Sequence, residues 1–232
     1  MENLEELKLD IQKKFEQLVF EEEAHVYNVG EKPLQSVSHF IKDYAGEFNA
    51  ISAAIGVAKK TGKTVGEVLQ EWEDMKNSAC DLGTATHLFG EYFLETGHAN
   101  PSNGHEEAVV KFWTDLPDNL VPVTLELKMY CIKKGIAGTA DIILYNKDTK
   151  KFVIADYKTN KDLFKNFKGK KLKAPFEDLY DSPFGKYTIQ LSMYQMLFEL
   201  TGYEVEERFI IWLKPDGTYK LYNTPDVRDK IE

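Results

Sequence analysis

The sequence lacks the features of secreted, membrane-spanning and repeat proteins. Cysteine occurs only as Cys80 and Cys131, and two such distant thiols form neither a metal-binding pattern nor a disulfide framework. No apolar run approaches the length that spans a bilayer, and the acidic first segment, MENLEELKLD, has no apolar core of a secretory signal. Internal repeats and low-complexity segments are also absent. We therefore expect a cytoplasmic, reduced protein without a membrane partner.

Positive charge is scarce overall but concentrated in one segment. The formal net charge is −9, which at first argues against a polyanionic partner. The segment 158-KTNKDLFKNFKGKKLK-173 nevertheless has seven lysines and one aspartate, with Phe164 and Phe167 between them. Such a stripe is typical of contact with a nucleic-acid backbone. A solvated lysine-rich loop is the simpler explanation for this segment taken alone.

The periodicity of apolar residues divides the chain into two parts. The hydrophobic content of 43% suffices for one domain with its own core. Residues 25–37 predict a small hairpin around Gly30, followed by a short helix. Helical spacing or helix signals predict five further helices, over residues 3–19, 47–60, 64–76, 80–96 and 104–116. The first part of the chain is therefore expected to be mainly helical.

From about residue 122 the apolar period becomes that of strands. A helix is predicted over 187–200. The predicted strands cover 122–131, 136–146, the stretch from Phe152 to Lys158, 205–213 and 218–222. We expect an α+β fold in which helices flank a central mixed sheet. Residues 1–79 would form an N-terminal helical and hairpin part packed on a core of residues 80–232.

Four groups of polar residues stand out against this pattern of elements. Each group alone is a weak signal, because such pairs occur by chance in many proteins. Residues four apart on a helix share a face, as do residues two apart on a strand. The four groups are Gly83-x3-His87-x3-Glu91, Gly138-x2-Asp141, Asp156-Tyr157-Lys158 and Gln190-x3-Tyr194.

The two aspartates indicate a site for a cation. Asp141 interrupts an apolar run, where a carboxylate is costly unless it is hydrogen-bonded, metal-bound or at the open end of the sheet. Carboxylates on adjacent antiparallel strands repel each other unless a cation lies between them. Oxygen ligands favour Mg²⁺ or Mn²⁺, and His87 makes Mn²⁺ acceptable. Lys158, beside Asp156, would then face the negative oxygens of a phosphodiester.

In this order, the four groups resemble the PD-(D/E)XK nuclease superfamily, with its restriction-endonuclease-like core, and specifically its RecB-like exonuclease branch. The likeness covers roughly residues 80–213 and is similar to phage-type exonucleases and the mitochondrial genome maintenance exonuclease. In those proteins a lysine-rich segment similarly separates the D-x-K strand from the Q-x-x-x-Y helix. Glu126 also resembles a strand glutamate common in this branch. Some relatives hold an iron–sulfur cluster with four cysteines, and two cysteines exclude that here.

The resemblance implies a Mg²⁺- or Mn²⁺-dependent deoxyribonuclease with one or two ions. Asp141 would be the central ligand. Asp156 and the Tyr157 carbonyl would complete the first site, and His87 would serve the second. The substrate would be DNA, as single strands or duplex ends, in recombination, repair or replication. A separate partner protein is an option, since the chain has no helicase motif.

The remaining residues receive supporting roles from the resemblance. Lys158 would position the attacking water or neutralise the developing charge. Glu91 would orient His87 or hold a metal-bound water, and Gln190 and Tyr194 would brace Lys158 and the DNA backbone. Contact with the DNA backbone would come from Lys161, Lys165, Lys168, Lys170, Lys171 and Lys173.

Three other interpretations stay open beside an exonuclease. The first is a structure-specific endonuclease, because sequence alone does not distinguish a narrow tunnel from an open groove. The second is a non-catalytic DNA-binding or partner-docking module, although such a module would be expected to have lost Asp141, Asp156 or Lys158. The third is a domain in which Asp156 and Lys158 form an ordinary ion pair, worth little at a surface. Phe164, Phe167 and Tyr187 are candidates for base stacking or for core packing.

Overall fold

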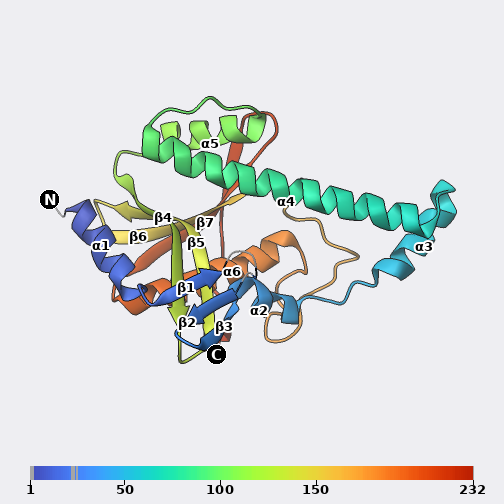
Figure 1. Ribbon diagram of the computed structural model, residues 1–232, viewed down its shortest axis with the longest axis horizontal. Coiled ribbons are helices and arrows are strands. Elements are labelled where there is room, and N and C mark those ends of the chain that lie inside the picture. The colour runs from blue at the N-terminus through green and yellow to red at the C-terminus, as the bar shows by residue number, and fades with distance from the viewer. Residues whose placement is uncertain (1–2, 22–23, 25, 232) are drawn as a thin grey trace.

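The computed structural model of the protein, which describes residues 3–21, 24 and 26–231, confirms the α+β fold. A mixed eight-stranded sheet is flanked by helices, and the strands lie mostly in the second half of the chain (Figure 1). The first part of the chain is mainly helical but also adds three strands to the sheet. No helix in this described part of the chain has the length and apolar character needed to cross a membrane.

The sheet is built around the predicted meander of three strands. These strands, β4, β5 and β6, are antiparallel neighbours, and β6 pairs in parallel with β7. The small N-terminal meander of β1, β2 and β3 joins the sheet through a short parallel pairing of β3 with β5. The strands are β1 (Leu18–Glu21), β2 (Val26–Val29), β3 (Lys32–Ser36), β4 (Leu120–Cys131), β5 (Ile136–Asn146), β6 (Lys151–Lys158), β7 (Val205–Leu213) and β8 (Tyr219–Asn223).

Helices cover the sheet and extend beyond it. Helix α6 and the N-terminal helix α1 pack on one face, and α5 packs on the other, where α4 also crosses (Figure 1). Helix α3 and the first half of α4 project away from the sheet as a helical arm. The helices are α1 (Leu4–Lys14), α2 (Val37–Tyr44), α3 (Ala50–Thr61), α4 (Val65–Thr96), α5 (Gly104–Asp115) and α6 (Pro183–Phe198).

Two strands, β3 and β6, pair with the same edge of β5 at different positions along it. Ile136 and Ala137 of β5 pair with β3, whereas its residues 142–146 pair with β6. Residues 138–141 therefore lie between these two pairings, and residues 138–140 pair only with β4 on the opposite edge. This gap contains Asp141, and β6 places Asp156 just beyond its last pairing with β5. The sheet thus opens where the two aspartates face each other.

Several helix boundaries differ from the sequence prediction, including the start of α6 at Pro183 rather than at residue 187. The first helix ends at Lys14, because the chain turns there to enter β1. The helices predicted over 64–76 and 80–96 form one helix, α4, which starts in a capping box at Thr64 and ends at Gly97 in a left-handed conformation. The polar residues between the two predicted helices are exposed and tolerated in the helix. The division of the chain expected between residues 79 and 80 corresponds to a position within α4 and stays a prediction.

Candidate metal and catalytic site

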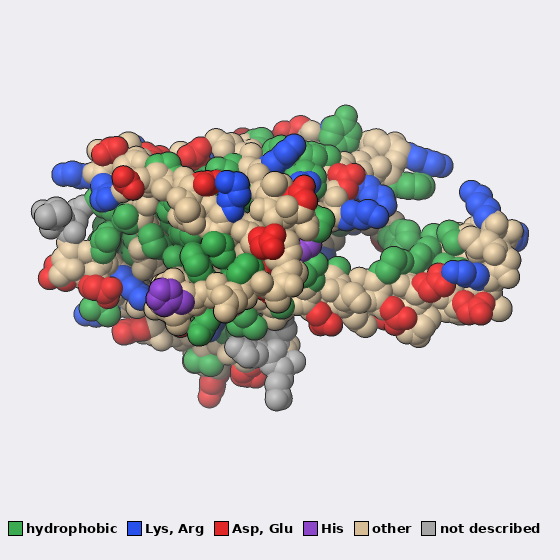
Figure 2. Space-filling model, turned by 90° about the horizontal axis from the view of Figure 1, so that it is seen from above, with side chains coloured by type: hydrophobic (Ala, Val, Ile, Leu, Met, Phe, Trp, Pro, Cys, Tyr) green, Lys and Arg blue, Asp and Glu red, His purple; other side chains and the backbone are tan. Residues whose placement is uncertain are grey.

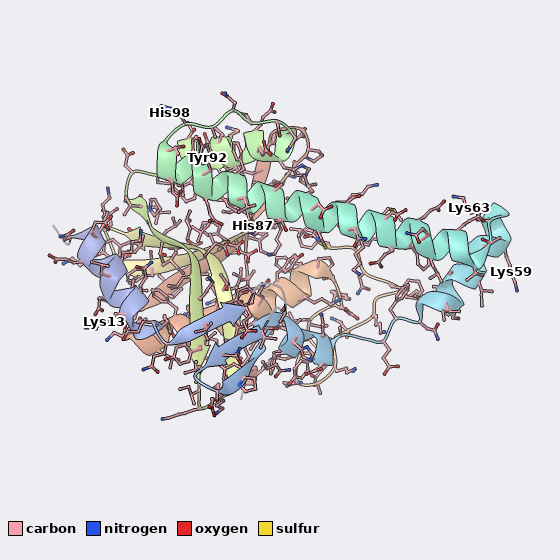
Figure 3. The ribbon with its side chains drawn as sticks, viewed as in Figure 1. Lys13, Lys59, Lys63, His87, Tyr92 and His98 are labelled. Carbon is pink, nitrogen blue, oxygen red and sulfur yellow. The ribbon has the colours of Figure 1, made fainter. Side chains whose placement is uncertain are left out.

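Three potential metal ligands converge where α4 crosses the opened edge of β5. They are His87 of α4, Glu126 of β4 and Asp141 of β5, and one ligand atom from each lies within 4.8 Å of the others. The His87 Nδ1 atom is 3.4 Å from an Asp141 carboxylate oxygen and 3.6 Å from one of Glu126. Figure 3 shows His87 on the side of α4 that faces the sheet. Two carboxylates and an imidazole suit Mn²⁺ or Mg²⁺ as ligands, so this donor set fits a divalent cation.

The backbone is irregular at the two carboxylates of this group. On β5, Ala140 and Ile142 are two residues apart, yet they pack into the cores on opposite faces of the sheet. The alternation of side chains therefore breaks at Asp141. On β4, Glu126 has a φ of 48°, which is rare for a residue with a side chain and costs on the order of 1–3 kcal/mol. Because of these two distortions, the carboxylates of Asp141 and Glu126 lie beside His87 and do not follow the regular alternation of side chains along a strand.

Asp156 and Lys158 contact each other, as expected for residues two apart on a strand. The Asp156 side chain is 1% exposed and touches the Lys158 ammonium, which is 14% exposed. Apart from this ion pair with Lys158, neither Asp156 oxygen has a hydrogen-bond partner within the described residues. A buried carboxylate in this state is costly, so its unused acceptor capacity fits a cation as well. Asp156 nevertheless lies outside the group of three ligand atoms around His87.

The pKa values of the histidine and of the two aspartates of the site are all raised, but for different reasons. Burial lowers the pKa of His87, but the charge of Asp141 and a hydrogen bond with Glu126 outweigh it and raise that pKa to about 9. Burial and the charge of Asp141 raise the pKa of Asp156 to about 6, against the opposing effect of Lys158. Burial also raises the pKa of Asp141. Without a metal ion, His87 and Lys158 are therefore the cations that balance these carboxylates at neutral pH.

This balance predicts a pH-dependent stability of the metal-free protein. Because the pKa of His87 is raised in the folded state, its contribution is complete below its ordinary pKa of about 6.5 and is lost as pH rises through about 9. We expect the free energy of unfolding in EDTA to fall by roughly 3 kcal/mol over this range. Denaturant titrations at several pH values measure it. His87→Gln should remove most of this decline, whereas His98→Gln, at an exposed histidine, should retain it.

A tyrosine of α6, Tyr187, lies beside Lys158, a position that the sequence did not predict for it. The Lys158 ammonium lies 4.6 Å from the centroid of the Tyr187 ring. Gln190 donates a hydrogen bond of 2.8 Å to the hydroxyl of Tyr194, which is 5% exposed. Tyr187, Gln190 and Tyr194 share a face of α6 because their spacing is three and four residues. That spacing was visible in the sequence, where Tyr187 was considered only for base stacking or packing.

Tyr157 is held by its neighbours on both sides. Its backbone N–H donates to the Asp141 carboxylate at 3.0 Å, and its hydroxyl accepts from the Trp113 indole at 2.5 Å. Its ring packs edge-on against His87, with centroids 5.7 Å apart. Gly90 allows this packing, since a β-carbon there would lie 2.9 Å from the ring. The Tyr157 backbone and ring thus locate both Asp141 and His87.

Glu91 lies one turn beyond His87 and faces the same hollow. This hollow, of about 510 Å³, is lined by His87, Glu91 and Glu126 together with Lys128, among others. Burial, and next the charge of Glu126, raise the pKa of Glu91. The two atoms that contact His87 Nδ1 belong to Asp141 and Glu126 rather than to Glu91.

The six lysines assigned to DNA contact divide into two groups. Three donate hydrogen bonds to main-chain carbonyls of the fold: Lys170 to Glu47, Lys171 to Asp178 and Lys173 to Asp43, at 3.0–3.3 Å. These bonds hold the loop in place. The other three are exposed, and no ion pair within the described residues involves them: Lys161, Lys165 and Lys168.

Gly138 provides a test of how tightly the opened strand is packed. A β-carbon there would lie 2.8 Å from the Tyr194 ring and 2.9 Å from a Val37 methyl group. We therefore expect Gly138→Ala to lower the free energy of unfolding by about 1–3 kcal/mol in denaturant titrations. Gly56→Ala is the matched control, because Gly56 lies in α3 with open space around it. That change should be neutral or stabilise by up to about 1 kcal/mol; equal effects at the two sites would contradict the packing argument.

Comparison with known proteins identifies the family of the chain. The profile of the PD-(D/E)XK nuclease superfamily matches residues 58–225, which include His87, Asp141, Asp156 and Lys158. The chain therefore belongs to the PD-(D/E)XK nuclease superfamily. Among curated proteins, no sequence matches the chain. Among solved structures, it is similar to one described as "Crystal structure of SSO0001", with 18% identity and a TM-score of 0.38, over 95% of this chain and 77% of that chain.

Proposed function

We propose that the protein is a Mg²⁺- or Mn²⁺-dependent exonuclease that hydrolyses DNA from a free end, in the RecB-like branch of its superfamily. The observation that carries the hydrolytic activity is the convergence of His87, Glu126 and Asp141 beside the buried Asp156–Lys158 pair. A docking module that performs no chemistry would have no use for so costly an arrangement of buried charges. A role in recombination, repair or replication is part of this proposal.

The residues of the site divide the chemistry between them. His87, Glu126 and Asp141 would hold the cation, which supplies charge stabilisation and activates water when it is bound. Asp156 would join them if its contact with Lys158 loosens on cation binding. The Lys158 ammonium would then be available to a phosphate oxygen or the attacking water, with the Tyr187 ring beneath it. The N–H of Tyr157 fixes the orientation of Asp141 throughout.

The preference for a free end rests on how the helical arm joins the core. The end of α2 and the linker after it are bonded to the loop between β6 and α6: Gly46 donates to the Asp181 carboxylate at 2.9 Å, and the Lys173 N–H donates to the Tyr44 carbonyl at 2.9 Å. At the other end, α4 returns to the core at Gly83, next to Thr159. Linker, arm and loop therefore surround a space beside the site.

The figures show this space from two directions. Figure 2 shows an opening between the arm and the body, with apolar side chains on the arm and lysine or arginine side chains on the body facing it. Figure 3 places Lys59 and Lys63 at the far end of the arm and His87 where α4 meets the sheet. A single strand threaded through this opening by its free end would reach His87. This supports an exonuclease over an enzyme that cuts within circles.

The test uses linear and circular DNA of the same sequence, single- and double-stranded, with Mn²⁺ and with EDTA. We expect linear molecules to be degraded to short products with Mn²⁺, circles to persist, and EDTA to stop all cleavage. A circle opened at one site by another enzyme is the control, and it should be degraded like the linear form. Rapid cutting of intact circles would instead establish the structure-specific endonuclease, and absence of any cleavage would leave the binding module.

A further inference from the structure

A row of side chains continues from Lys158 across the sheet toward its edge. Lys158 of β6 is in register with Trp212 of β7, and Trp212 with Lys220 of β8. Residues in register on paired strands point to the same face. The row from Lys158 to Lys220 spans two strand spacings, or roughly 10 Å. That length corresponds to about three stacked nucleotides, at a rise of ~3.4 Å each.

An exposed aromatic ring lies over this row. Phe164 of the lysine-rich loop is 48% exposed. Its ring packs against Tyr222 and Phe184 with centroids 5.1 Å apart in both cases, and edge-on against Trp212 at 6.4 Å. These three rings hold Phe164 in one place, and two of them, Tyr222 and Trp212, also contact each other at 5.9 Å. The ring is therefore a fixed platform with a face open to solvent, which is what base stacking needs.

The same surface carries lysines that lack a carboxylate partner within ion-pair distance among the described residues. The Lys214 ammonium lies over the Trp212 ring. Burial, and then the charge of Lys220, lower the pKa of Lys214, although Asp216 and Asp162 oppose this. The two ammonium groups therefore repel each other, and a polyanion beside them would relieve that repulsion. We call Phe164, Trp212, Tyr222, Lys214 and Lys220 the aromatic–lysine surface.

The surface is connected to the site by hydrogen bonds. The Trp212 indole donates to the Asn160 carbonyl at 2.7 Å, and the Tyr187 hydroxyl donates to the Asn160 side-chain oxygen at 2.7 Å. Tyr187 in turn lies under Lys158. The surface is thus fixed in relation to Lys158, so a strand bound there is held at a defined distance from the reacting phosphate.

We propose that the aromatic–lysine surface binds the single strand of nucleic acid on one side of the cleaved bond. One base stacks on Phe164, and Lys220 and Lys214 contact the phosphates next to it. This rests on the proposed function and adds to it a binding subsite of two to three nucleotides, about 10 Å beyond Lys158. The surface contacts the phosphate backbone and the face of a base, which all nucleotides have, so it does not select a base sequence.

The test measures binding rather than cleavage, in EDTA, with a fluorescent thymidine oligonucleotide of about 12 nucleotides. Phe164→Leu keeps the apolar packing but removes the stacking face, and it should weaken binding by about 5-fold or more without changing the salt dependence. Phe164→Trp should retain binding. Lys220→Gln should reduce the slope of log Kd against log salt by about 0.7, the value for one phosphate contact on a single strand.

Matched controls separate these effects from general changes in charge or folding. Tyr92→Leu removes an exposed ring from α4, and Lys133→Gln removes an exposed lysine from the β4–β5 turn. Both should bind as the unsubstituted protein does, and thermal unfolding verifies that every variant is folded. If Phe164→Leu and Lys220→Gln behave like these controls, the subsite is refuted while the nuclease remains. If the unsubstituted protein binds no single strand, the subsite is refuted together with a single-stranded substrate.

Discussion

Asp141→Asn should abolish DNA cleavage, with a loss on the order of 10²–10³-fold or greater, while the protein remains folded. The reason is the position of this carboxylate, which lies 3.4 Å from His87 and belongs with it and Glu126 to the one group of potential ligands within the described residues. Asparagine removes a charge from the ligand set. Its side-chain oxygen can still accept the hydrogen bond from the Tyr157 N–H, so β5 and β6 should keep their arrangement.

Two measurements separate chemistry from folding in this variant. Cleavage of linear DNA with Mn²⁺ gives the rate, and calorimetric titration with Mn²⁺ alone gives the affinity for the ion, which should fall as well. Asp148→Asn is the matched control, because Asp148 lies exposed in the turn at the far end of β5. It should retain full activity. An Asp141→Asn protein that cleaves DNA within about tenfold of the original rate would rule out Asp141 as a ligand.

The order of the elements was predictable because the apolar residues of each segment follow either the period of a helix or the period of a strand. The meander of β4, β5 and β6 and the hairpin of β7 and β8 appear where alternation or apolar runs end at turn residues. The attachment of the N-terminal strands was not predictable, because β3 meets β5 through only two residue pairs, Gln35 with Ile136 and Ser36 with Ala137. A contact so short and so distant in sequence leaves no periodic signal.

The continuity of α4 was missed for a different reason. The residues between positions 76 and 80 belonged to neither predicted helix, but they are exposed on a single helix that leaves the body of the protein. A projecting helix needs no continuous apolar face over its whole length, since only part of it packs on α3 or on the sheet. Periodicity therefore underestimates such helices.

The site was predictable as a set of residues but not as a geometry. Spacing alone placed Asp156 with Lys158, and these two are in contact. The irregular backbone at Glu126 and the broken alternation at Asp141 are not encoded in any local pattern. They lie at the gap between the pairings of β3 and β6 along one edge of β5. Glu126, rather than Glu91, is in contact with His87. The sequence indicated Glu126 only through a resemblance.

The second large effect is expected at the Asp156–Lys158 pair. Lys158→Met should abolish cleavage and also destabilise the protein at pH 8, by about 3–5 kcal/mol, because it leaves the Asp156 carboxylate buried without its partner. Lys158 normally opposes the rise in the pKa of Asp156, which stands at about 6. In the variant that pKa should be higher still.

The pH dependence identifies the cause of this destabilisation. A carboxyl group whose pKa is raised by folding costs no stability below its ordinary pKa, because it is protonated in both the folded and the unfolded state. As the pH rises from that ordinary pKa toward the folded-state pKa, the folded protein loses stability relative to the unfolded one. Lys158→Met should therefore be close to the unsubstituted protein in stability at pH 4–5 and fall behind it as pH increases to 8. Denaturant titrations across this range measure the difference.

The double variant Asp156→Asn/Lys158→Met completes the argument, because it removes both charges together. Its stability at pH 8 should recover most of what Lys158→Met loses, since no unpaired buried charge remains, whereas cleavage should stay abolished. Lys76→Met is the control, because Lys76 forms an exposed ion pair with Glu73 on α4 and should change stability little at any pH. If the double variant is no more stable than Lys158→Met, the loss comes from the packing of the lysine chain rather than from an isolated carboxylate.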